Sequence, residues 1–159
     1  MIILGIDPGL ASTGWAVVEN LLEPKLIAYG LIKTIKNLSQ EKRFLQIYEE
    51  LHELIENYRP QVLCLEKVFF NTNAKTALIV GEARGIVKIC ALLKRVALAE
   101  FTPLQIKSAI TGYGRAEKKQ IQEMVRILLR LDQIPKPDDA ADAVAAALTY
   151  CFYKKDLEK

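Results

Sequence analysis

Apolar and polar positions divide the chain into stretches with strand-like and helix-like spacing. Five short runs, rich in apolar and β-branched residues, predict strands. These runs are residues 2–7, 13–20, 25–34, 62–66 and 96–101. Short turns join the first three, which predicts an antiparallel meander. Helical crossovers precede the last two, which favours parallel pairing with earlier strands.

Helical spacing of apolar residues predicts helices between and after these runs. In the first of them, from Ser39 to Tyr58, Ser39 is a suitable N-cap, although Lys42 leaves the capping box incomplete. The other predicted helices span residues 73–95, 103–110, 116–131 and 138–153. Together these elements predict the α/β fold class, with a mixed five-stranded sheet flanked by helices.

Length and composition predict one globular domain over residues 1–159. Hydrophobic residues make up 51% of the chain and charged residues 26%. No apolar run approaches the roughly 20 residues that a membrane-spanning helix needs. The first residues lack the basic lead and cleavage site of a signal peptide. We therefore expect a cytoplasmic protein.

The cysteine and histidine content argues against several classes of site. Cys64, Cys90 and Cys151 lie far apart and form no Cys-x-x-Cys pair, which disfavours a disulfide framework or a zinc site. The single histidine, His52, falls within a helical pattern, where a partly exposed helix residue is the simpler interpretation. A Ser-His-Asp hydrolase is therefore disfavoured.

Charge is distributed unevenly, although the net charge is only +3. Residues 67–130 carry 12 Lys and Arg against 4 Asp and Glu, whereas the rest of the chain carries 10 against 15. A basic segment between acidic ends is typical of a protein with a phosphate-rich partner. A solvated surface with clustered charges would give the same pattern.

Two of the predicted strands end in a carboxylate. Asp7 closes the apolar run of residues 2–7, before Pro8 and Gly9, and Glu66 closes the run of residues 62–66. Sites in α/β sheets form at strand ends, so parallel neighbouring strands would bring the two acids side by side. Alone, each acid could equally be a turn residue.

The segment KPDDAADAVAAALTY adds a third acidic feature. Pro137 suits the first turn of a helix, and Asp138 or Asp139 suits its N-cap. Asp142 could share a helix face with either of them, and spacing alone does not choose. The many alanines would let this helix lie close to the sheet. Clustered carboxylates without His or Cys would suit a hard divalent cation such as Mg²⁺ or Mn²⁺, two of which can catalyse phosphoryl transfer.

The sequence resembles the bacterial RuvC family of Holliday-junction resolvases. Motifs that carry the resemblance run in order along nearly the whole chain: GIDPGLASTGWAVV, LEKVFFNTNAKTAL, GEARGIV, QIKSAITGYGRAEKKQIQEMV and DAADAVAAALTYC. The resemblance implies a ribonuclease H-like fold and a crossover junction endodeoxyribonuclease. This enzyme would use Mg²⁺, with two ions per active site and Mn²⁺ as a substitute, to resolve four-way DNA junctions by paired symmetric nicks in recombination and repair.

Family motifs also imply the site residues. The catalytic and metal-binding acids fall on Asp7, Glu66, Asp139 and Asp142. This assignment chooses Asp139 over Asp138, although Asp138 stays a rival for capping or metal binding.

The resemblance places DNA contacts at Phe69, Lys107 and Lys118. Phe69 would stack on an unpaired base, with a core residue as the alternative and Phe70 as the other candidate. The neighbouring Arg115 and Lys119 are interpreted as further phosphate contacts, with a solvated helix start as the alternative.

Partners and rival functions follow from the same comparison. The family is dimeric through the helix predicted at residues 73–95, which carries Gly81 and Gly85. A helix buried within the monomer is the alternative. The resemblance further implies cooperation with a branch-migration motor complex and no contact with a membrane. Rival functions are a junction-binding module that does not cut, an actin-like ATPase or sugar kinase, for which the chain is too short, and a generic ribonuclease H.

Overall fold

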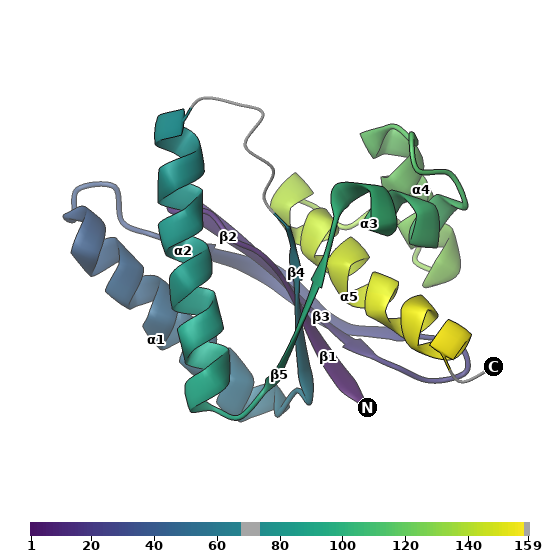
Figure 1. The fold of residues 1–159 in the computed structure, drawn as a ribbon, viewed down its shortest axis with the longest axis horizontal. Coiled ribbons are helices and arrows are strands. Elements are labelled where there is room, and N and C mark those ends of the chain that lie inside the picture. The colour runs from purple at the N-terminus through teal and green to yellow at the C-terminus, as the bar shows by residue number, and fades with distance from the viewer. Residues whose placement is uncertain (68–73, 158–159) are drawn as a thin grey trace.

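One mixed five-stranded sheet forms the centre of the protein, with helices on both faces (Figure 1). The structure is a computed structural model that describes residues 1–67 and 74–157. The strands are β1 (Ile2–Asp7), β2 (Ser12–Glu19), β3 (Lys25–Lys33), β4 (Val62–Glu66) and β5 (Ala97–Phe101). Their order across the sheet is β3-β2-β1-β4-β5, which confirms the predicted α/β class.

The pairing of the strands agrees with the prediction from the connections. β1, β2 and β3 form the antiparallel meander, and β4 pairs in parallel with both β1 and β5. Central strands β1 and β4 are covered on both faces: Leu4, Ile6, Leu63 and Leu65 are completely buried on the face of α1 and α2, and Ile3 and Cys64 on the face of α5. Each such side chain contributes about 2 kcal/mol of burial free energy, so the strand ends beside them are held firmly.

Helices α1 (Gln40–Tyr58) and α2 (Ala74–Leu93) cover one face of the sheet (Figure 1). The Ser39 hydroxyl accepts a hydrogen bond from the Lys42 N–H at 3.5 Å, so the predicted N-cap is confirmed. α1 ends at Arg59, which adopts the left-handed conformation with φ of 47°. Ile47, Leu51 and Val87 of the two helices are buried in one cluster with the sheet residues of this face.

The opposite face carries α5 (Asp138–Leu157), with α3 (Pro103–Thr111) and α4 (Lys118–Leu128) beside it (Figure 1). The alanines make α5 thin, and glycines on the sheet receive it. A methyl group on Gly5 would lie 2.0 Å from the carbonyl oxygen of Ala143, and one on Gly14 would lie 2.0 Å from that of Asp139. Helix and sheet therefore meet backbone to backbone, as the alanine content predicts.

Two expectations need correction. α5 begins at Asp138, and the Pro137 carbonyl accepts hydrogen bonds from the N–H groups of Ala140 and Ala141. Pro137 therefore precedes the helix directly, and the prediction of Asp138 or Asp139 as N-cap is wrong. The alternative of a deeply buried α2 is also wrong, because one part of this helix faces solvent. Its exposed large apolar side chains are Leu78, Ile89, Leu92 and Leu93.

Within the described part of the chain, no helix combines the length and the apolar character needed to cross a membrane.

Candidate active site

Two acids lie together at one end of the sheet because of the parallel pairing of β1 and β4. The ladder runs to the pair Ile6 and Leu65, and the next residues of the two strands are Asp7 and Glu66. Both acids line a cavity of about 300 Å³. Its other lining residues are Pro8, Lys67, Val80, Arg84 and Pro103.

Helix α5 brings further acids to the same place. Asp7 pairs with Gly14 in the β1–β2 ladder, and Gly14 is in backbone contact with Asp139. The close approach of α5 thus places Asp139 and Asp142 in the electrostatic field of Asp7, whose pKa they both raise. The Asp138 side chain, by contrast, is 68% exposed.

Asp7 is the most strongly perturbed acid of the group. Burial raises its pKa from 3.8 to about 7, and the negative charges of Asp142, Asp139 and Glu66 add to the rise. The positive charge of Lys118 opposes it. Without a further cation, Asp7 is therefore about half protonated at neutral pH.

Glu66 and Asp142 respond in the same direction. Burial, followed by the charge of Asp142, raises the pKa of Glu66, although the charges of Arg84, Lys107 and Lys118 act against it. Burial also raises the pKa of Asp142, and this effect outweighs the hydrogen bond that Asp142 accepts from Lys118. Burial is thus the main cause of the raised pKa values, and the charges of neighbouring acids add to it.

Lys118, at the start of α4, is the cation that contacts the acids of α5. Its ammonium lies 2.9 Å from Oδ2 of Asp142 and 3.2 Å from Oδ2 of Asp138. Although burial acts in the opposite direction, these bonds and charges raise the pKa of Lys118. Asp138 also accepts a hydrogen bond from Gln122 of α4 at 3.1 Å, so it joins α4 to the start of α5.

The donor chemistry of the site suits a hard divalent cation. Asp7, Glu66, Asp139 and Asp142 offer oxygen ligands only, and burial raises the pKa values of Asp7, Glu66 and Asp142, so a bound cation would favour their charged forms. In the described residues, no three side chains of His, Cys, Asp or Glu already converge with the spacing of a metal site. Lys118 partly supplies the positive charge instead.

The predicted DNA-contacting residues fall into three groups. Lys107 and Lys118 lie near the acids, since both act on the pKa of Glu66. Arg115 and Lys119 are exposed between the end of α3 and the first turn of α4. Among the described residues, it is Lys118 and neither of these two that forms ion pairs with the acids. Phe69 lies outside the described residues, as does its alternative Phe70.

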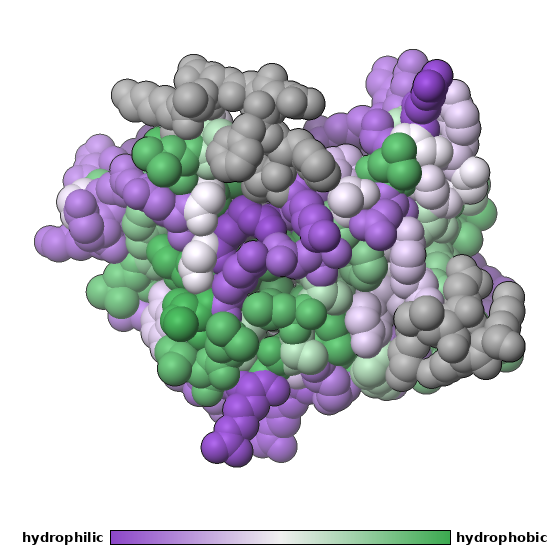
Figure 2. All heavy atoms as spheres, viewed as in Figure 1, coloured by the Kyte–Doolittle hydropathy of each residue, from purple (hydrophilic) through white to green (hydrophobic). Residues whose placement is uncertain are grey.

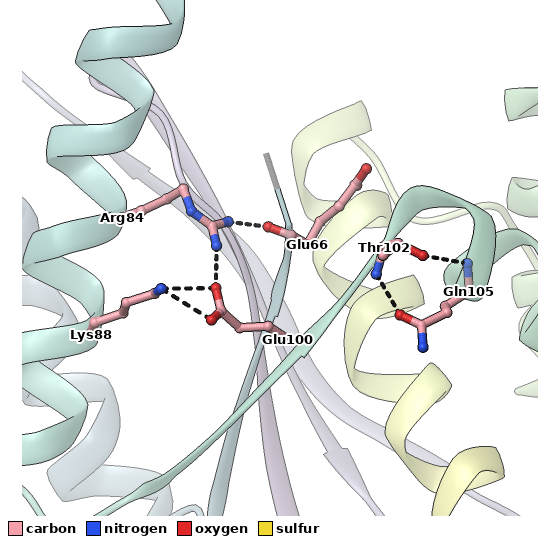
Figure 3. Close-up of polar contacts among 6 residues, drawn as sticks. All are labelled: Glu66, Arg84, Lys88, Glu100, Thr102 and Gln105. Atoms are coloured by element: carbon pink, nitrogen blue, oxygen red, sulfur yellow. Dashed lines mark hydrogen bonds and ion pairs between the residues drawn. The ribbon is translucent and has the colours of Figure 1, made fainter. Parts of the chain in front are cut away.

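Sequence reasoning missed Arg84, which is 8% exposed and lines the cavity. Its guanidinium donates hydrogen bonds to the Glu66 main-chain carbonyl and to the Glu100 carboxylate (Figure 3). An Arg among apolar helix residues is a weak signal, because a long side chain can reach solvent from many positions.

A larger cavity of about 520 Å³ lies elsewhere, between the β2–β3 turn and the end of α4. Among the described residues, Glu23 is the one carboxylate in its lining, and Arg130 already pairs with it at 2.7 Å. The smaller cavity, beside Asp7 and Glu66, is therefore the better candidate for the active site.

Comparison with known proteins identifies the family of the chain. Residues 3–150 match the family model for crossover junction endodeoxyribonuclease RuvC. A relative of that name from Caldanaerobacter subterraneus subsp. tengcongensis is 46% identical over 162 residues, which cover 100% of this chain and 97% of the relative. Another from Caldicellulosiruptor saccharolyticus is 49% identical and covers 94% of this chain and 92% of its own.

A solved structure gives the same result. T. thermophilus RuvC in complex with Holliday junction substrate superposes with a TM-score of 0.93 at 34% identity, over 98% of this chain and 96% of the other. A mixed five-stranded sheet with acids at the ends of neighbouring parallel strands defines the class of ribonuclease H-like nucleases. Within that class, the chain belongs to the RuvC family of crossover junction endodeoxyribonucleases.

Proposed function

We propose that this chain, acting as one nuclease domain, resolves four-way DNA junctions by paired symmetric nicks during homologous recombination and DNA repair. The observation that carries the proposal is the placement of Asp7, Glu66 and Asp142 in one another's field at the end of the sheet. Relatives of nearly equal length support the substrate, one of them solved with a Holliday junction.

Mg²⁺, with two ions per site and Mn²⁺ as a substitute, is the metal that we propose for the acids. Asp7, Glu66, Asp139 and Asp142 would hold the ions, because their oxygen ligands and excess negative charge suit hard divalent cations. When bound, such ions supply activation of an attacking water and stabilisation of the leaving oxygen.

The protein's own residues prepare the site for a phosphodiester. The ends of β1 and β4 hold Asp7 and Glu66 on buried strands, which keeps both carboxylates in place during the reaction. Lys107 acts on Glu66 in the direction that keeps it ionised. Lys118 neutralises Asp142 and, being 49% exposed, can transfer its N–H donors to an arriving phosphate.

DNA would approach over the basic side chains on the α3 and α4 side of the site. Lys107, Lys118, Arg115 and Lys119 are proposed phosphate contacts, and Phe69 is proposed to stack on a base at the mouth of the site. In the view of Figure 2, hydrophilic side chains gather between the positions of α2 and α3, which suits a charged ligand.

A homodimer through α2 is part of the proposal. Leu78, Ile89, Leu92 and Leu93 are each at least 50% exposed, and open space surrounds Gly81 and Gly85. Figure 2 shows hydrophobic side chains over the end of α2 that leads to β5. An isologous dimer would present two sites to a junction that is itself twofold symmetric.

Family membership also supports action in the cytoplasm together with a branch-migration motor complex.

Cleavage of a labelled four-way junction tests the function directly. With Mg²⁺, we expect paired nicks at symmetric positions, weak cutting of a linear duplex and of an RNA–DNA hybrid, and no cutting in EDTA. Asp7→Asn should bind the junction without cutting it, whereas a distant change such as Glu23→Gln should cut normally. Equal cutting of the hybrid would favour a generic ribonuclease H, and full activity of Asp7→Asn would rule out the assigned metal site.

A further inference from the structure

The end of β4 depends on a side chain for a hydrogen bond that a strand would normally supply. The β1–β4 ladder ends at the pair Ile6 and Leu65. Beyond it stands Pro8, which has no N–H to donate. The main-chain carbonyl of Glu66 accepts its hydrogen bond from Nη1 of Arg84 on α2 instead (Figure 3). Arg84 therefore supplies the hydrogen-bond donor at the end of β4, the strand that carries Glu66.

The guanidinium of Arg84 is itself held in place by β5. Nη2 of Arg84 donates to Oε1 of Glu100, so the two ends of the planar fork engage two different strands. Lys88, one turn further along α2, also pairs with Glu100, at 2.9 Å to Oε1 and 3.1 Å to Oε2. The Arg84 side chain is only 10% exposed, so water competes weakly for its donors.

These bonds orient the Glu66 side chain through its own backbone. On the other side of the peptide, the N–H of Lys67 donates to the Phe101 carbonyl at 2.7 Å. The peptide that follows Glu66 is thus fixed from α2 and from β5, and its plane sets the direction of the adjoining Cα–Cβ bond. Figure 3 shows the Glu66 carbonyl facing Arg84 while the carboxylate extends to the other side, toward α5.

We propose that Arg84 is a positioning residue for metal-dependent cleavage: it fixes the end of β4, and thereby the carboxylate of Glu66, and Glu100 fixes Arg84. This inference rests on the proposed function. It is specific to the fork geometry, because Lys88 shares the Glu100 carboxylate but makes no bond to Glu66. Lys88 is therefore the matched control.

Two measurements on the same variants test the proposal. The first is the single-turnover rate of junction cleavage at saturating Mg²⁺, beside the junction dissociation constant in EDTA. The second is independent of activity: the Mg²⁺ concentration that gives half of the metal-induced rise in unfolding temperature. A purely structural role would lower the unfolding temperature in EDTA but would leave the Mg²⁺ midpoint unchanged.

For Arg84→Gln we expect a cleavage rate about 10–100-fold lower and a Mg²⁺ midpoint raised about 10-fold, with unchanged junction binding. Arg84→Lys keeps the charge but not the fork, so it should recover only part of the loss. Lys88→Gln should stay within about threefold of the wild type in both measurements, because its partly exposed ion pair is weak.

Each outcome decides the question. If Arg84→Gln matches Lys88→Gln in rate and Mg²⁺ midpoint, the positioning role is overturned. If Arg84→Gln does not fold, Glu100→Gln takes its place: a loss of rate and a raised Mg²⁺ midpoint support the proposal, and wild-type values overturn it. If the wild type cuts no junction, the proposed function fails, and the Mg²⁺ midpoints alone still decide whether Arg84 positions Glu66.

Discussion

Glu66 and Glu100 lie on neighbouring strands, since Glu66 pairs with Phe101 and Glu100 with Leu65. Their pKa values nevertheless shift in opposite directions. Burial raises the pKa of Glu66, and the charge of Asp142 adds to the rise. Burial would also raise the pKa of Glu100, but the hydrogen bond and charge of Lys88 and the charges of Arg84 and Lys67 lower it below its usual value. The same residue type on neighbouring strands thus has two electrostatic states, and Glu66 is the more deeply buried of the two.

Burial and the supply of close cations together explain the difference. The Glu100 carboxylate forms ion pairs with both Arg84 and Lys88, whereas among the described residues only Lys118 forms an ion pair with an acid of the site. In this Glu100 cluster, the carboxylate already has two cationic partners, Arg84 and Lys88. The acid group remains short of positive charge, which is the condition for binding a divalent ion tightly.

The largest expected difference between the acid group and the Glu100 cluster is in the effect of a substitution on cleavage activity. Asp7→Asn removes one of the proposed metal ligands and should lower the cleavage rate on the order of 10³-fold, because metal catalysis is worth several kcal/mol. Glu100→Gln removes one of the two bonds that hold the Arg84 guanidinium and should lower the rate by about 3- to 10-fold. Single-turnover cleavage of a four-way junction measures both, and equal losses would remove the distinction between the regions.

In the absence of metal, Asp7→Asn and Glu100→Gln should change the free energy of unfolding in opposite directions. The pKa of Asp7 is raised from 3.8 to about 7, so the folded state binds the extra proton and wild-type stability falls as pH rises between these values. In EDTA at pH 8, Asp7→Asn should therefore raise the free energy of unfolding by about 2–4 kcal/mol. Below pH 4 the two proteins should differ little. Urea unfolding across this pH range measures the effect.

The Glu100 variant is the control for that measurement. The lowered pKa of Glu100 means that its contribution is present at neutral pH and is lost as pH falls through the acid range. Glu100→Gln should therefore lower stability at pH 8, by about 1 kcal/mol or less. If Asp7→Asn also lowered the free energy of unfolding at pH 8, the ionised Asp7 carboxylate would not destabilise the folded protein.

The smallest expected effect concerns Lys118, the cation closest to the acids of α5. Since its ammonium lies 2.9 Å from Asp142, a bound metal ion must compete with it. Lys118→Met should lower the Mg²⁺ concentration for half-maximal thermal stabilisation by about two- to fivefold, the value of a partly exposed ion pair, and should still reduce cleavage. A raised Mg²⁺ midpoint would mean that Lys118 supports the metal site instead of competing with it.

Local patterns were enough to predict the strand ends. The apolar run before Asp7 and the one before Glu66 specify buried strands, and Pro8 and Gly9 stop the first of them, so both acids could be placed at one edge of the sheet. The alanines of α5 likewise predicted a close approach, which Gly5 and Gly14 make possible. The prediction failed at the helix cap, because Pro137 and not an aspartate precedes α5.

The sequence by itself determined which residues form strands and helices and which acids stand at their ends, because those features depend on hydrophobic spacing over a few residues. Only the tertiary structure decided that Arg84 completes the end of β4, that Glu100 is neutralised and that Asp7 is not. Each of these depends on charges and hydrogen-bond donors far apart in the chain and on the burial of the groups between them, and one-dimensional spacing contains neither.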